Sequence, residues 1–143
     1  MLTESKTFPG IQEHLASILS WTYGQVKTFS LPDKELKRVE LALEEAIVNI
    51  LNYAPAEAPL ELTITIRNLP TKQLEIELKD NGNPFNPLTH KFDDQSHLPL
   101  EERKPGGLGV MLIIRCMDAV TYRFEDGYNI LTLTKDTDSS PST

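Results

Sequence analysis

Two segments in which apolar and polar residues alternate constrain the fold of this 143-residue chain more than any other feature. The apolar positions are Leu60, Leu62, Ile64 and Ile66 in residues 60–67, and Leu74, Ile76 and Leu78 in residues 73–79. Such alternation predicts two strands that each bury one face, and the short connection at 68–72 predicts a hairpin. An antiparallel sheet is therefore the expected framework.

Helical spacing of apolar residues dominates the chain before this hairpin. Residues 11–29 predict one helix, and a second is predicted from Pro32 to Tyr53, where Pro55 and Pro59 follow and end it. The core face of the second helix should be Leu36, Val39, Leu43, Ala46, Ile47 and Ile50.

The second half of the chain also contains both helical and alternating patterns of apolar residues. Residues 81–104 predict a long loop, of the kind that serves as a lid or binding loop. Residues 107–118 predict a helix that is apolar nearly all round and therefore buried on several sides, with Cys116 in the core. Strands at 119–125 and 129–135 should flank a turn at Asp126-Gly127. We predict an α+β, two-layer sandwich with a mixed, mostly antiparallel sheet and helices on one face.

Composition and charge limit the classes of function that are expected for this chain. The chain has 14 basic and 21 acidic residues, a net charge of −7, which argues against nucleic-acid binding because phosphate backbones require a basic surface. No apolar run reaches the ~18 residues of a membrane span and the N-terminus lacks a signal peptide, so no membrane contact and a cytoplasmic location are expected. Residues 1–135 are predicted to form one domain, with 136–143 as a disordered tail.

Three polar features are candidates for a site. Glu45, Asn49 and Asn52 share one face of the second helix, which is either a solvated surface or the wall of a cleft. A carboxylate there can take a proton from a hydroxyl, and an amide oxygen is a suitable ligand for Mg²⁺. Asp80 ends a strand and Gly82 follows it, which is either simple turn chemistry or a carboxylate placed to accept a hydrogen bond from an amine.

The third feature is a glycine cluster before the last helix. Gly106, Gly107 and Gly109 lie where free helix amides can bind an anion, although such clusters also occur without a ligand. Arg103 stands just upstream, either to neutralise phosphate charge or to keep the loop soluble.

Together these segments resemble the ATP site of the GHKL superfamily (the Bergerat fold), which includes gyrase, histidine kinases and MutL. The segment Leu43-Glu-Glu-Ala-Ile-Val-Asn49 resembles its E-A-x-x-N box. Asp80-Asn-Gly-Asn-Pro-Phe-Asn-Pro87 resembles its D-x-G-x-P-F-D-P box, with Asn86 in place of Asp. The run from Gly107 to Tyr122 is similar to the stand-alone anti-sigma-factor serine/threonine kinases.

The resemblance implies a role for each matched residue. Glu45 falls on the general base and Asn49 on the Mg²⁺ ligand, with Asn52 on the same face. Tyr53 stands where many relatives have a basic residue or His. The remaining residues implied to bind ATP are Asp80, Gly82, Pro84, Phe85, Arg103, Gly106, Gly107, Leu108, Gly109 and, near adenine on the last strand, Asn129 or Thr132.

The resemblance also implies partners. Members of this branch hold a sigma factor inactive and phosphorylate a small anti-sigma-factor antagonist (a STAS-type protein) on Ser or Thr, and they form homodimers. One alternative is a nucleotide-responsive protein-binding module of the same fold that transfers no phosphate. A third interpretation is the ATP-binding part of a larger sensor kinase.

Overall fold

The computed structural model describes residues 3–90, 97–102 and 108–137. The strands are β1 (Thr3–Pro9), β2 (Glu61–Leu69), β3 (Gln73–Asp80), β4 (Ala119–Glu125) and β5 (Tyr128–Asp136). The helices are η1 (Gln12–His14), α1 (Leu15–Val26), α2 (Asp33–Tyr53), η2 (Leu100–Glu102) and α3 (Leu108–Cys116). None of the helices in these ranges has the length and apolar character needed to cross a membrane.

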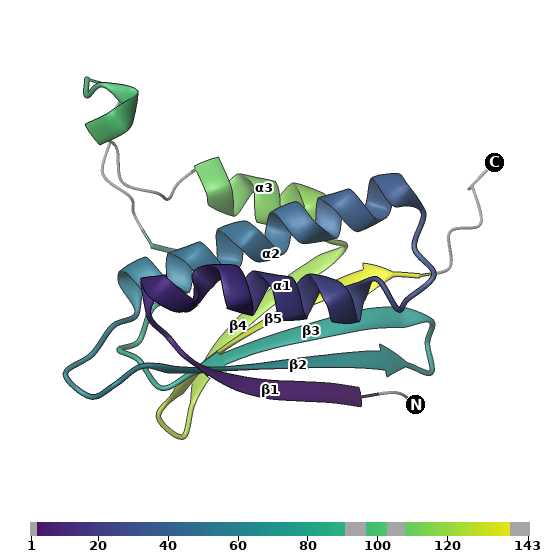
Figure 1. Ribbon diagram of the computed structural model, residues 1–143, viewed down its shortest axis with the longest axis horizontal. Coiled ribbons are helices and arrows are strands. Elements are labelled where there is room, and N and C mark those ends of the chain that lie inside the picture. Colours follow the sequence, from purple (N-terminus) through teal and green to yellow (C-terminus); the bar gives the residue numbers. More distant parts are fainter. Residues whose placement is uncertain (1–2, 91–96, 103–107, 138–143) are drawn as a thin grey trace.

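In the described residues the strands form a five-stranded sheet in the order β1-β2-β3-β5-β4, and every pairing is antiparallel. The three α-helices cover the same face of this sheet (Figure 1). The α+β two-layer architecture predicted from the sequence is thus confirmed, while the sheet is wholly antiparallel rather than mixed. The β2–β3 hairpin and the β4–β5 hairpin lie where the alternation placed them.

Strand β1 was missed by the sequence analysis. Its residues Thr3–Thr7 are exposed, and only Phe8 is buried. The strand exists because it pairs with β2 along its whole length, from Thr3 opposite Arg67 to Pro9 opposite Glu61. A long-range pairing of this kind leaves almost no local hydrophobic pattern.

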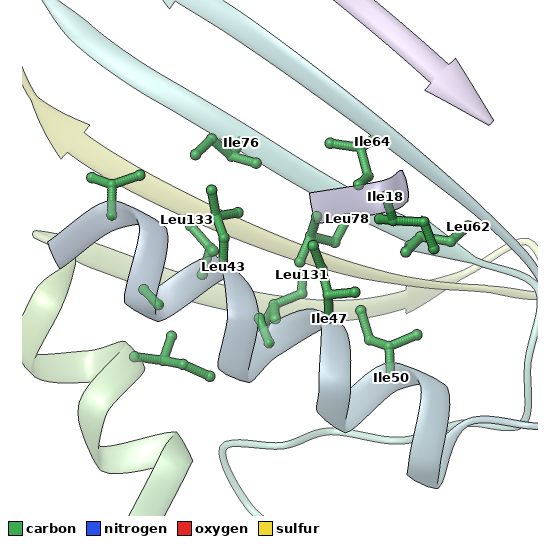
Figure 2. Packing of buried hydrophobic residues seen from close by; sticks show 14 of the residues in the cluster. Ile18, Leu43, Ile47, Ile50, Leu62, Ile64, Ile76, Leu78, Leu131 and Leu133 are labelled. Carbon is green, nitrogen blue, oxygen red and sulfur yellow. The ribbon is translucent and has the colours of Figure 1, made fainter. Parts of the chain in front are cut away.

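The core lies between α2 and the inner face of the sheet. Figure 2 shows Leu43 and Ile47 of α2 beside Leu131 and Leu133 of β5. On the neighbouring strands, Ile66 and Leu133 both pair with Ile76, and Ile64 and Leu131 both pair with Leu78. Complete burial of such a side chain stabilises the fold by about 1.5–3 kcal/mol. Along β3, the residues of this inner face are therefore Leu74, Ile76, Leu78 and Asp80.

The α3 helix differs from its prediction. Its sequence is apolar nearly all round, yet Met111 and Ile114 are 50% and 52% exposed. Among the α3 residues whose burial is described, 109–116, the buried ones are Gly109, Val110, Ile113 and Cys116. The helix lies beside α2 in the helical layer, so one side packs against the protein and the other faces outward. The expectation of burial on several sides was wrong.

The β4–β5 turn and the C-terminal end of β5 were both predicted from the sequence. Asp126 and Gly127 have φ of 54° and 87°, the left-handed pair that a tight hairpin turn requires, as predicted. Asp136 belongs to β5, and the amide of Thr137 donates to the carbonyl of Lys72 at 2.9 Å. Strand β5 thus ends one residue past the predicted domain boundary, and 138–143 of the predicted tail lie outside the described residues.

Candidate functional site

Asp80 is the buried acid of the site. It ends β3 on the inner face of the sheet and is 1% exposed. Its Oδ1 accepts hydrogen bonds from the Gly82 amide and from Asn129 Nδ2, both at 2.9 Å. Burial raises the pKa of Asp80 above its usual value, while these two hydrogen bonds act in the opposite direction. A buried carboxylate held at one oxygen is suited to accept a hydrogen bond at the other.

Asn129 lies opposite Asp80, on the adjacent strand β5. It is buried and connects three segments, because its amide bonds Asp80, the carbonyl of Asn83 and the amide of Phe85. Thr132, the other residue suggested for the last strand, pairs with Glu77 and so lies on the outer face of the sheet. The structure thus does not bring Thr132 to Asp80, since successive strand residues alternate between faces.

The backbone of Gly82 packs closely against the C-terminal end of α2. A Cβ built on Gly82 would overlap the carbonyl oxygen of Ala54, the residue that caps α2. The next amide, Asn83 N, donates to that same carbonyl at 2.8 Å. Only glycine allows this approach, and it fixes the loop after Asp80 directly against the C-terminal end of α2. The second and first candidate segments are therefore neighbours.

Three aromatic rings continue this junction. Tyr53 from the last turn of α2 stacks on Phe85, with ring centroids 5.3 Å apart and planes 14° from parallel. His90 contacts both, at 5.5 Å from Tyr53 and 5.0 Å from Phe85. Phe85 is buried and Pro84 is exposed. Tyr53 thus contributes an aromatic surface to this junction.

Asn49 is the buried amide of α2. It is 1% exposed, and neither its side-chain nitrogen nor its side-chain oxygen has a hydrogen-bond partner among the described residues. A buried polar group left without a partner costs about 1–3 kcal/mol, so native proteins rarely keep one without a reason. At Asn49 itself, this burial contradicts the interpretation of the face as a solvated surface.

Glu45 lies one helical turn before Asn49 and is half-buried. Burial raises the pKa of its carboxyl, and the charge of Glu44 raises it further. A Cβ built on Gly109 would overlap Glu45 Oε2, so the first turn of α3 contacts this carboxylate. Side chains with perturbed pKa values are common in catalytic sites, and the helix N-terminus beside Glu45 is a favourable place for an anion.

The remaining candidate residues are Asn52, Arg103, Gly106, Gly107 and Leu108. Asn52 is exposed, and its amide donates to the carbonyl of Val48 and accepts from Gln12 of η1. The structure therefore uses Asn52 to connect α2 with η1. Arg103, Gly106 and Gly107 lie outside the described residues, and Leu108 is described only as the first residue of α3.

These residues fit Mg²⁺ when the ion is held mainly by its nucleotide. Among the described residues no group of three or more His, Cys, Asp or Glu is arranged to hold a metal. Mg²⁺ often takes one or two protein oxygens, with phosphate and water for the rest. The amide oxygen of Asn49, which has no hydrogen-bond partner among the described residues and lies one helical turn from the Glu45 carboxylate, has the chemistry that such a ligand requires.

Comparison with known proteins identifies the family. Residues 8–135 match the histidine kinase-like ATPase domain, so the chain belongs to this family, as the sequence motifs predicted. By structure, it is similar to the histidine kinase domain of a blue-light-activated histidine kinase from Erythrobacter litoralis. The TM-score is 0.57 at 14% identity, over 91% of this chain and 62% of that one, which supports the fold.

Two curated relatives are named as protein kinases. The serine/threonine-protein kinase BtrW from Bordetella bronchiseptica is 32% identical over 95 residues, which is 66% of each chain. The serine-protein kinase RsbW from Bacillus mycoides is 30% identical over 128 residues, covering 86% of this chain and 78% of the relative. The aligned part thus spans just under two thirds of BtrW and more of RsbW.

Proposed function

We propose that this protein is a Mg²⁺-ATP-dependent kinase that phosphorylates Ser or Thr of a small anti-sigma-factor antagonist and, in another nucleotide state, sequesters a sigma factor. The observation that carries the proposal is the buried, unpartnered amide of Asn49, one helical turn from the half-buried Glu45. The domain family and the names of the relatives supply the reaction class.

The residues divide the chemistry between them. Asp80 would accept a hydrogen bond from the adenine amine, and Gly82 would let the base lie close to the backbone. Asn49 Oδ1 would hold Mg²⁺, which supplies neutralisation of phosphate charge when bound. The amides at the start of α3, with Arg103, Gly106 and Gly107 before it, would hold the terminal phosphates.

Glu45 would act on the protein substrate. The acceptor hydroxyl oxygen bonds the γ-phosphorus as the bond from that phosphorus to the β–γ bridging oxygen breaks, and ADP leaves. The hydroxyl proton goes to a Glu45 carboxylate oxygen. Catalysis then consists mostly of positioning and charge neutralisation.

A Glu45→Gln variant tests this assignment, with Glu44→Gln as its matched control. Glu44 is exposed and points about 100° away around the helix. We expect Glu45→Gln to bind ATP normally and to transfer phosphate at least ~100-fold more slowly, the usual effect of losing a general base. The Glu44→Gln variant should stay within a few-fold of wild type. Equal turnover in all three proteins would remove Glu45 from the role.

The alternative is a nucleotide-responsive binding module that transfers no phosphate. The observation in its favour is Tyr53, which packs on Phe85 where many relatives have a basic group. Mass spectrometry of a candidate antagonist after incubation with Mg²⁺-ATP separates the two: a mass gain of one phosphate supports the kinase. An unmodified antagonist that still binds in a nucleotide-dependent way supports the module.

The proposed partners include a second copy of the chain. Homodimerisation is implied by the relatives, and sedimentation velocity tests it directly. A cytoplasmic location is proposed with the sigma factor as partner, because transcription takes place there.

A further inference from the structure

Asn129 makes four hydrogen bonds and has no capacity left for a ligand. Its Nδ2 donates to Asp80 Oδ1 at 2.9 Å and to the Asn83 carbonyl at 2.8 Å. Its Oδ1 accepts from the Phe85 amide at 2.9 Å and from the Tyr122 hydroxyl at 2.5 Å. A carboxamide offers two N–H donors and two lone pairs, so every one is used. Asn129 therefore does not contact a nucleotide through its side chain.

The orientation of this amide follows from its backbone partners. The Phe85 amide can only donate and the Asn83 carbonyl can only accept, so the oxygen must face Phe85 and the nitrogen must face Asn83. The second N–H is then directed at Asp80 Oδ1, and the second lone pair at Tyr122 of β4. The side chain has one arrangement in which all groups are satisfied.

The consequence for Asp80 is asymmetric. Both of its side-chain hydrogen bonds within the described residues go to Oδ1, from Gly82 and from Asn129, and none goes to Oδ2. The carboxylate cannot rotate without breaking two hydrogen bonds in a buried environment, which is expensive. Oδ2 is thus the oxygen left to interact with a ligand.

We propose that Asn129, held by Tyr122, is a positioning residue that fixes the Asp80 carboxylate so that Oδ2 accepts a hydrogen bond from the 6-amino group of a purine nucleotide. This inference rests on the proposed ATP binding and deepens it, since it assigns base selectivity. A 6-oxo purine presents an acceptor oxygen to the fixed carboxylate, so it is rejected by two acceptors facing each other.

The test is calorimetric titration of the full chain with Mg²⁺-ATP and with the triphosphate of purine riboside, which lacks only the 6-amino group. Wild type should prefer ATP by about tenfold or more, the usual effect of a hydrogen bond to a charged group. In Asn129→Leu this preference should fall to near one, with affinity for the deaminated nucleotide little changed. Thr134→Val, on the outer face of the same strand, should keep the wild-type preference.

Each other outcome is decisive. Equal weakening of both nucleotides, with their ratio preserved, would overturn the inference and leave Asn129 a purely structural residue. No preference for ATP in wild type would also overturn it, while leaving nucleotide binding intact. Failure of wild type to bind either nucleotide would instead contradict the proposed function.

A second variant keeps the inference testable if Asn129→Leu does not fold. Tyr122→Phe removes only the hydroxyl that donates to Asn129 Oδ1. We expect a smaller loss of preference in the same direction, again without loss of affinity for the deaminated nucleotide. A folded Tyr122→Phe variant with the full wild-type preference would overturn the inference, because loosening Asn129 would then leave the recognition by Asp80 unchanged.

Discussion

Replacement of Asn49 by leucine should make the nucleotide-free protein more stable and less able to use Mg²⁺. Leucine has nearly the same shape as asparagine but no polar atoms. In the structure Asn49 is 1% exposed, and both its amide atoms lack partners among the described residues. Asn49→Leu therefore removes a buried unsatisfied group and replaces it with an apolar one.

The expected gain follows from that burial. An unsatisfied buried polar group costs about 1–3 kcal/mol, so the free energy of unfolding should rise by about that amount. For a domain of this size, the gain corresponds to roughly 3–10 °C in Tm. The same variant should lose the part of the ATP-induced increase in Tm that depends on Mg²⁺, because the amide oxygen is gone.

Urea and thermal unfolding, with and without Mg²⁺-ATP, measure both effects. Asn52→Leu is the matched control: Asn52 lies three residues further along α2 but is exposed and hydrogen-bonded, so this variant should show no such gain in the free energy of unfolding. If Asn49→Leu instead lowered the free energy of unfolding of the nucleotide-free protein by about 1 kcal/mol or more, the amide would have structural partners. Asn49 would then be a structural residue, and its burial would give no reason to expect a Mg²⁺ ligand there.

Three further predictions follow from other contacts. Gly82→Ala should destabilise the fold by more than about 1 kcal/mol, because the new Cβ meets the Ala54 carbonyl. Gly24→Ala, at an exposed position of α1, should stabilise it by about 0.5–1 kcal/mol; chemical denaturation measures both. Burial and the charge of Glu44 raise the pKa of Glu45. As the solution is acidified, the rate of phosphotransfer should therefore fall at a higher pH than for a carboxyl with the ordinary pKa of 4.5, and Glu44→Gln should move that fall to lower pH. Lys135 contacts Glu35 at 2.6 Å and donates to the Cys116 carbonyl at 2.8 Å, and its hydrogen bond lowers the pKa of Glu35. The contribution of this pair to the free energy of unfolding should therefore be present above about pH 4.5 and be lost as the pH falls through the lowered pKa. In Lys135→Met this contribution should be absent at any pH.

Local patterns were sufficient for most of the fold. The alternation at 60–67 and 73–79, the helical face of α2 and the Asp126-Gly127 turn each express a local preference that agrees with the tertiary structure. Strand β1 could not be predicted this way, because only Phe8 is buried in it and its pairing partner lies more than 50 residues away. The α3 helix was misjudged because composition does not reveal which side of an apolar helix a second layer leaves uncovered.

The candidate site was predictable where a motif and a backbone constraint coincide. The contact between Gly82 and Ala54, which only glycine permits, places Asp80 and Gly82 against the end of α2. Glu45 and Asn49 lie one turn apart on the same helix. The choice between Asn129 and Thr132 depended on the β3–β5 register, which pairs strands separated by a long loop and a helix. Sequence spacing alone does not give such a register.

The most direct test of the proposed Mg²⁺-ATP site is calorimetric titration of the wild-type chain with ATP, with and without Mg²⁺. We expect micromolar binding that weakens when Mg²⁺ is removed, because the Asp80 and Asn49 groups each supply part of the affinity. Absence of detectable binding of both ATP and ADP would contradict it, and the orphaned amide of Asn49 would then need another ligand.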